Sequence, residues 1–102
     1  MKPYHNKDMD FLYRGILTLQ NREECYAFFE DICTIKELQA MAQRFQVAAK
    51  LKNNKNYQEI QLSTGASSAT ISRVNKCLLY GSGGYEKALE RIEKEQEDGS
   101  DS

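Results

Sequence analysis

The sequence predicts a small all-α protein of about six helices, with residues 1–102 forming a single domain. Apolar side chains recur at three- and four-residue steps over most of the chain, as they do on one face of an α-helix. Hydrophobic residues make up 40% of the chain and charged residues 28%, with a single proline, and this composition suits a folded helical protein. At 102 residues, the chain is long enough for one core and too short for two independent ones.

The first two helices are expected within residues 8–32, which also carry the predicted dimerisation surface. The first runs from Asp8 to about Leu19, with acidic residues near its start, where the helix dipole favours them. Asn21 is placed to cap the second helix, which is rich in aromatic side chains and extends through Asp31. Two successive helices with so much apolar surface are expected to pack against a second copy of the chain.

The clearest predicted helix covers residues 35–52 and opens a segment, 34–80, that also holds the candidate functional motif. Thr34 and Glu37 match the capping-box pattern Thr-x-x-Glu. The apolar residues that follow have helical spacing: Ile35, Leu38, Met41, Ala42, Phe45, Ala48 and Ala49. Asparagines and lysines after residue 52 favour a turn at a helix C-terminus.

Two shorter helices are expected next, over residues 57–64 and from the capping residue Ser67 to Tyr80, with Gly65 between them. This arrangement fits a helix-turn-helix, whose first helix lies across DNA phosphates while the second presents its N-terminal residues to base edges. Glycine permits the left-handed backbone that such a turn needs. An ordinary helical hairpin, whose serines cap and solvate it, is the alternative. The inward-facing positions are Ile60, Ala66, Ile71 and Val74.

The outward residues of the second short helix have side chains that suit contact with double-stranded DNA. Hydroxyl groups can bond to base edges or phosphates, methyl groups can touch thymine, and basic groups can bind phosphate or guanine. The candidate DNA-binding residues are Ser67, Ser68, Ala69, Thr70, Ser72, Arg73 and Lys76.

A last, highly charged helix is expected over residues 85–96, followed by a disordered tail at 97–102. The run Gly81-Ser82-Gly83-Gly84 precedes it. As a phosphate cradle this run would need a following Lys-Ser/Thr and a preceding strand, so a helix stop is the favoured interpretation.

Charge is distributed unevenly along the chain, although its net value is only −1. Residues 1–35, 36–76 and 77–102 carry net charges of −2, +5 and −4, respectively. The basic middle segment indicates a phosphate-binding face, with an ordinary solvated face as the alternative.

The residue types argue against an enzyme, a metal site and a cofactor. His5 is the only histidine and lies near the N-terminus, so no acid-base set of the usual kind can be assembled and no catalytic residue is assigned. Cys25, Cys33 and Cys77 lie in apolar stretches without Cys-x-x-Cys spacing, which predicts buried, reduced thiols rather than disulfides or zinc ligands. No apolar run approaches the roughly 20 residues of a membrane span, and no secretory signal is visible, so a cytoplasmic protein is expected.

The run from Glu59-Ile60 through Gly65-Ala66, followed by Ala69-Thr70-Ile71-Ser72-Arg73, closely resembles the helix-turn-helix of the bacterial Trp repressor. Upstream, a further set of residues can be laid on that repressor's preceding helix without a gap: Thr34, Glu37, Ala40, Arg44 and Val47. The segments TIKELQAMAQRFQVA, YQEIQ, TGASSATISRVNKCL and YGSGGY resemble the YerC/YecD group of Trp repressor-like bacterial proteins.

The resemblance implies a six-helix chain, an intertwined homodimer and recognition helices that enter successive major grooves. It also implies an effector pocket, because the two arginines that sandwich L-tryptophan in the Trp repressor correspond to Arg44 and Arg73. The glycine beside which the indole inserts is replaced by Val74, so L-tryptophan is not expected to bind, whereas another small effector remains open. For both arginines, contact with phosphate or nearby acids is the favoured interpretation.

Together these features predict a sequence-specific, DNA-binding transcriptional regulator that uses a helix-turn-helix in the major groove. The alternative is a dimeric helical protein-protein interaction module that retains the fold without binding DNA, which the low net charge and acidic ends favour.

Overall fold

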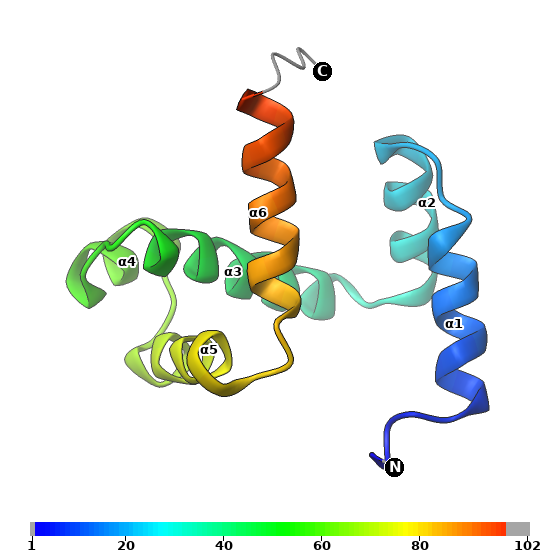
Figure 1. Cartoon of the computed structure of the whole chain (residues 1–102), viewed down its shortest axis with the longest axis horizontal. Coiled ribbons are helices and arrows are strands. Elements are labelled where there is room, and N and C mark those ends of the chain that lie inside the picture. The colour runs from blue at the N-terminus through cyan, green and yellow to red at the C-terminus, as the bar shows by residue number, and fades with distance from the viewer. Residues whose placement is uncertain (1, 98–102) are drawn as a thin grey trace. The chain divides into compact units, whose positions relative to one another are not determined.

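The computed structural model describes residues 2–97, which form six α-helices and no strand (Figure 1). The predicted all-α class is therefore confirmed. The chain divides into two compact units, with the first ending at Leu38 and the second beginning at Gln39. A single domain over residues 1–102 stays a prediction. The helices are α1 (Lys7–Leu17), α2 (Arg22–Ile32), α3 (Ile35–Lys52), α4 (Tyr57–Thr64), α5 (Ser68–Tyr80) and α6 (Gly84–Glu97).

Asparagine caps set the starts of α1 and α2. The side chain of Asn21 accepts a hydrogen bond from the backbone N–H of Glu24 at 2.9 Å, which confirms the predicted cap of α2. Asn6 caps α1 in the same way through Met9, also at 2.9 Å. Asn6 was not predicted as a cap, and the predicted start of α1 therefore lies one residue late. The predicted end lies two residues late.

Helices α1 and α2 contain no buried residue within their own unit. Phe28 and Phe29 pack edge to face, with ring centroids 5.3 Å apart, but most of the apolar surface remains uncovered. Phe11 is 74% exposed and Leu17 is 83% exposed. The unit therefore presents the broad apolar surface from which the sequence argument expects dimerisation.

Helix α3 has the predicted bounds and the predicted capping box. The Thr34 N–H donates to Glu37 Oε1 at 2.8 Å, and the Glu37 N–H donates to Thr34 Oγ1 at 3.1 Å. Of the predicted apolar series, Ala48 is buried and Phe45 and Ala49 pack against the core. Ile35 is 73% exposed instead, and Val47, which is outside that series, is fully buried. The buried positions are those that face α4, α5 and α6, and spacing along one helix does not reveal where those neighbours lie.

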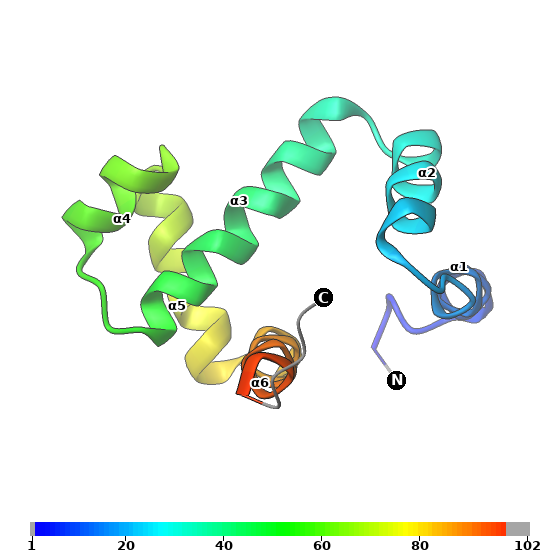
Figure 2. The ribbon, with the colours of Figure 1, turned by 90° about the horizontal axis from the view of Figure 1, so that it is seen from above.

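The core of the described residues lies in the second unit. Figure 2 shows α4, α5 and α6 gathered along the C-terminal part of α3. Helix α6 runs steeply across α3 in Figure 1 and is seen almost end-on in Figure 2, and its Leu89 belongs to the buried cluster. Phe45 on α3 stacks on Tyr85 of α6 with a centroid separation of 6.4 Å and an interplanar angle of 25°. The buried residues are Val47, Ala48, Ile60, Ala66, Ile71, Val74 and Leu89.

Lys52, the last residue of α3, joins that helix to α6. Its Nζ lies 3.2 Å from Glu86 Oε1 and 3.1 Å from Glu93 Oε1. Hydrogen bonds to Glu93 and then Glu86 raise the pKa of Lys52 above its ordinary value. Helix α6 extends one residue beyond each end of the predicted 85–96, a difference typical of frayed helix ends. Residues 98–102 of the predicted disordered tail lie outside the described residues.

The cysteines correct another expectation. All three thiols are free, but Cys25 and Cys77 are exposed and Cys33 is half-buried, so the prediction of buried thiols is wrong for the first two. Apolar neighbours in sequence lie on other faces of the same helix, and proximity in sequence therefore does not imply burial. None of the helices in residues 2–97 combines the length and apolar character that a membrane span needs.

Candidate DNA interface

The turn between α4 and α5 depends on a glycine backbone conformation. Gly65 ends α4 with φ of 74° and ψ of 4°, in the left-handed region, and its N–H donates to the Gln61 carbonyl at 2.9 Å. This is the conformation for which the sequence argument required a glycine. The chain then re-enters a helix within three residues, which places α4 and α5 against one another.

A serine cap orders the start of α5. The Ser67 side chain accepts a hydrogen bond from the Thr70 N–H at 3.1 Å, which confirms the predicted cap. The Ser67 hydroxyl also donates to Thr70 Oγ1 at 3.1 Å. The two hydroxyl groups at the tip of the helix are therefore held in a defined relative position.

The inner faces of α4 and α5 belong to the buried core. Ile60 and Ile71 are fully buried, and Ala66 and Val74 are 4% and 1% exposed, so all four predicted inward positions are confirmed. They share one cluster with Val47 of α3. The α4–α5 pair is thus built as a closely packed unit on α3 rather than as a loose hairpin.

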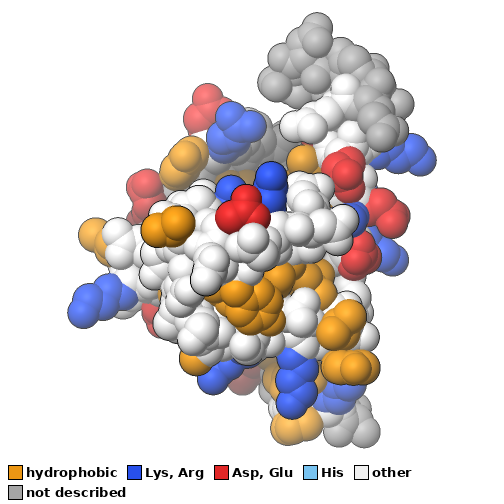
Figure 3. Space-filling view, turned by 90° about the vertical axis from the view of Figure 1, so that its left-hand side faces the viewer, with side chains coloured by type: hydrophobic (Ala, Val, Ile, Leu, Met, Phe, Trp, Pro, Cys, Tyr) orange, Lys and Arg blue, Asp and Glu red, His pale blue; other side chains and the backbone are white. Residues whose placement is uncertain are grey.

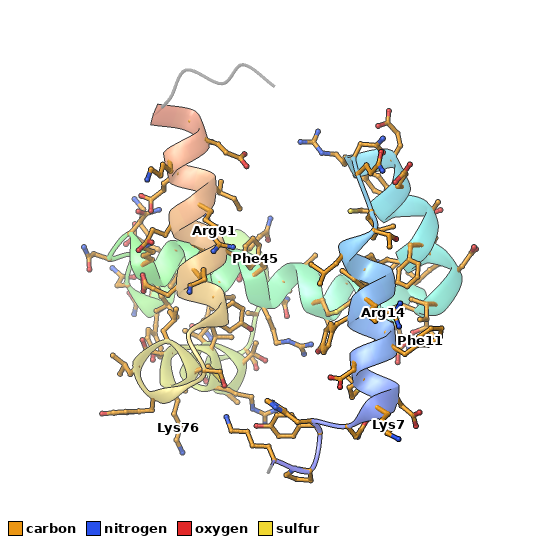
Figure 4. All side chains as sticks on the ribbon, turned by 45° about the vertical axis from the view of Figure 1, so that its right-hand side comes forward. Lys7, Phe11, Arg14, Phe45, Lys76 and Arg91 are labelled. Atoms are coloured by element: carbon orange, nitrogen blue, oxygen red, sulfur yellow. The ribbon has the colours of Figure 1, made fainter. Side chains whose placement is uncertain are left out.

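The outer face of α5 is polar and basic from Ser68 to Lys76. Thr70 is half-buried beside the cap, and the other six predicted DNA-facing residues are exposed: Ser67, Ser68, Ala69, Ser72, Arg73 and Lys76. Lys76 projects from α5 away from α3 (Figure 4). No acidic residue occurs in α5. The face opposite the core can therefore offer hydroxyl, methyl and cationic groups to a polyanion.

Not every lysine of the basic middle segment, residues 36–76, is available to bind phosphate. Lys52 is paired with two glutamates, so it does not belong to an open basic face. Lys50 and Lys55 instead line a groove of about 280 Å³ beside α4, together with Glu59, Leu62 and Ser63. Figure 3 views the second unit from the side of α4 and α5, where basic and acidic side chains project around hydrophobic patches.

The three residues assigned to an effector pocket lie in two different environments. Arg44 and Arg73 are exposed, and within residues 2–97 neither guanidinium forms an ion pair or hydrogen bond. Val74 is a core residue. Its methyl groups fill space between helices, so this side chain contributes to the packing of the core.

Two residues that the sequence argument overlooked organise the turn. The Thr64 hydroxyl donates to the Ile60 carbonyl at 2.6 Å and accepts from the Ala66 N–H at 3.1 Å. The Gln43 amide nitrogen donates to the Thr64 carbonyl at 3.2 Å. Threonine at a helix end is a recognisable local signal, whereas nothing in the sequence around Gln43 indicates a partner 21 positions away.

Six helices and a closely packed α4–α5 pair joined at a left-handed glycine define a helix-turn-helix protein. The model of the Trp repressor protein family matches residues 7–93. The chain therefore belongs to the Trp repressor family.

Individual relatives agree with this assignment. The uncharacterized protein YerC of Bacillus subtilis (strain 168) is 49% identical over 94 residues, which are 92% of this chain and 90% of YerC. A TrpR-like protein from Eubacterium eligens ATCC 27750 superposes with a TM-score of 0.85 at 45% identity, covering 87% of this chain and 92% of its own. A candidate Trp repressor from Staphylococcus aureus superposes with a TM-score of 0.86 at 43% identity, covering 91% of this chain and 96% of its own.

Proposed function

We propose that this protein is a sequence-specific regulator of transcription that binds double-stranded DNA through α5. The observation that carries the proposal is the two-sided character of this helix. Its inner face is buried against α3 and α4, while its outer face exposes polar and basic groups without an acid. Membership of the Trp repressor family supports the same function. We also propose that the protein is cytoplasmic and acts as a homodimer.

Distinct roles follow from the chemistry along α5. Ser68, Ala69 and Thr70 stand in its first turn, the part of a recognition helix that reaches base edges. Arg73 and Lys76 lie on later turns, where a cation can hold the phosphate backbone. Arg44, which is exposed on α3, is a further phosphate ligand in this proposal.

The experiment is a selection of duplexes from a random DNA library by the full chain, followed by binding titrations at several salt concentrations. A regulator should enrich a defined sequence and should bind it more weakly as salt rises, because phosphate contacts release counterions. Lys76→Ala should reduce the magnitude of the salt slope by about one, as expected for one lost phosphate contact.

Lys94→Ala is the matched control, since it removes an exposed lysine from the last turn of α6. The proposal predicts an unchanged salt slope for this variant. Enrichment of no sequence would contradict the proposal and favour a protein-protein interaction module. Equal effects of the two lysine variants would contradict the proposed orientation of α5.

A further inference from the structure

We infer that Gln43 is a positioning residue for DNA recognition, which holds the α4–α5 turn in register on α3. The inference rests on the proposed function and adds a residue that lies outside the DNA-facing set. Gln43 is half-buried on α3, and its Nε2 donates to the backbone carbonyl of Thr64 at 3.2 Å.

This hydrogen bond differs in kind from the others. It spans 21 positions in the sequence and joins two neutral groups, whereas the other side-chain hydrogen bonds within residues 2–97 either join residues at most four apart or belong to the ion pairs of Lys52 with Glu86 and Glu93. The local bonds stabilise individual caps and turns. The bond from Gln43 is thus the one directional polar contact that ties the α4–α5 turn to another helix of this described part.

The accepting carbonyl belongs to the last residue of α4. The last four carbonyls of a helix have no partner inside that helix. The Gln61 carbonyl is satisfied by the Gly65 N–H, and the Thr64 hydroxyl is occupied by Ile60 and Ala66. The Thr64 carbonyl is left for Gln43, and without that donor a half-buried acceptor would lose its partner.

Directionality is what makes this bond relevant to recognition. The apolar contacts of Ile60, Ile71 and Val74 hold the helices together, but hydrophobic attraction has no preferred direction. A recognition helix must be placed to within about 0.5 Å for its side chains to meet base edges. A hydrogen bond weakens steeply with misalignment, so Gln43 restricts sliding and rotation of the turn on α3.

The test compares Gln43→Met with Gln46→Met in the full chain. Methionine keeps an unbranched side chain of similar size but lacks the amide donor. Gln46 is exposed on the same helix and makes no side-chain hydrogen bond within the described residues, so it controls for the substitution itself. We expect Gln43→Met to bind the selected duplex about tenfold more weakly, because the released turn shifts to expose the Thr64 carbonyl to water and must return to its place, with that acceptor unpaired, to read the bases. Affinity for a random-sequence duplex should stay within about twofold, because phosphate attraction does not depend on register.

A second readout does not involve DNA. The carbonyl carbon resonance of Thr64 should move in Gln43→Met, and hydrogen exchange at the Ala66 amide should accelerate, with both unchanged in Gln46→Met. An unchanged Thr64 signal, or a shifted signal with full sequence discrimination, would overturn the inference. If the wild-type chain selects no DNA sequence, the proposed function fails, while these NMR signals still decide whether Gln43 holds the turn. Gln43→Glu, which keeps the shape and removes the donor at neutral pH, serves if the methionine variant does not fold.

Discussion

At Gly65 the backbone alone, and not crowding, restricts the choice of residue. Its φ is 74°, and apart from Gly65 itself and the two adjacent residues no atom lies within 4 Å of the position that a Cβ would occupy. We predict that Gly65→Ala lowers the free energy of unfolding by about 1–2 kcal/mol, the cost of the left-handed conformation for a residue with a side chain. Gly65→Asn should cost less, because asparagine visits this region more readily. Urea unfolding of the full chain measures both.

Gly84→Ala is the control for this series. Gly84 also has no neighbour within 4 Å of its missing Cβ, but its φ is not positive. Alanine there should leave stability unchanged or slightly higher, because it restricts the unfolded chain without strain in the folded one. If Gly65→Ala left the free energy of unfolding unchanged, the turn would have to adopt another conformation, which would contradict this prediction.

Val74 decides the expected response to L-tryptophan. The side chain is 1% exposed and packs in the cluster with Ile60 and Ile71, so room for an indole at this position would require repacking the core. Overpacking costs about 1–3 kcal/mol, which corresponds to a roughly five- to hundredfold loss of affinity. We predict weak or no binding of L-tryptophan, although Arg44 and Arg73 are retained. Calorimetric titration checks this, and saturable micromolar binding coupled to tighter DNA binding would contradict it.

Along α5, the proposed division of labour separates specificity from affinity. Ser68→Ala and Thr70→Ala should change which sequences are selected, because these residues stand in the first turn near base edges. Arg73→Ala should weaken binding to all sequences to a similar extent, because phosphates are common to all of them. Repeating the library selection with each variant distinguishes these outcomes. If Arg73→Ala were the only variant to change the selected sequence, the roles assigned to Arg73 and to the first turn of α5 would be reversed.

The contact between α3 and α6 should depend on pH through Lys52. Because its pKa is raised in the folded state, the ion pairs with Glu93 and Glu86 stabilise the fold while Lys52 is charged. That contribution is complete below the unfolded-state pKa of about 10.4 and is lost as pH rises through the higher folded-state value. Unfolding should therefore show wild type more stable than Lys52→Met at neutral pH, with the difference disappearing in strong alkali. A difference that persists there would point to packing of the lysine stem instead.

The whole chain is expected to form a homodimer. Within its own unit, the surface of α1 and α2 is too apolar to remain in water, as the exposure of Phe11 and Leu17 shows. We predict one tight dimer by light scattering at micromolar concentration. Phe11→Glu should weaken the dimer, whereas Arg14→Glu, a change on the same helix at an already polar position, should weaken it less. A stable wild-type monomer would contradict this prediction.

A twofold dimer also constrains the DNA. Two recognition helices that enter successive major grooves stand one helical turn, about 34 Å, apart. The sequence selected from the random library should therefore be an approximate palindrome whose half-sites are about 10 base pairs apart. Enrichment of a single unrepeated half-site would argue against the dimeric arrangement.

Local signals account for the elements that the sequence predicted well. Thr34, Asn21 and Ser67 are caps that act within three or four residues, and Gly65 ends α4 through its own backbone. The bounds of α3 and α4 were predicted correctly for this reason. The four inward positions of the helix-turn-helix were also predictable, since a short helix packed on one side has only one face to bury.

Taken alone, the sequence determined the helices, the turn and the polar outer face of α5, because each depends on residues close together in the chain. Tertiary structure alone decided that Val47 is fully buried in the core while Ile35 stays 73% exposed. It also removed Lys52 from the basic surface and gave Gln43 its partner at Thr64. Those outcomes depend on how the helices cross. Contacts that form only when helices pack leave no periodic pattern in the sequence, so they cannot be predicted from it.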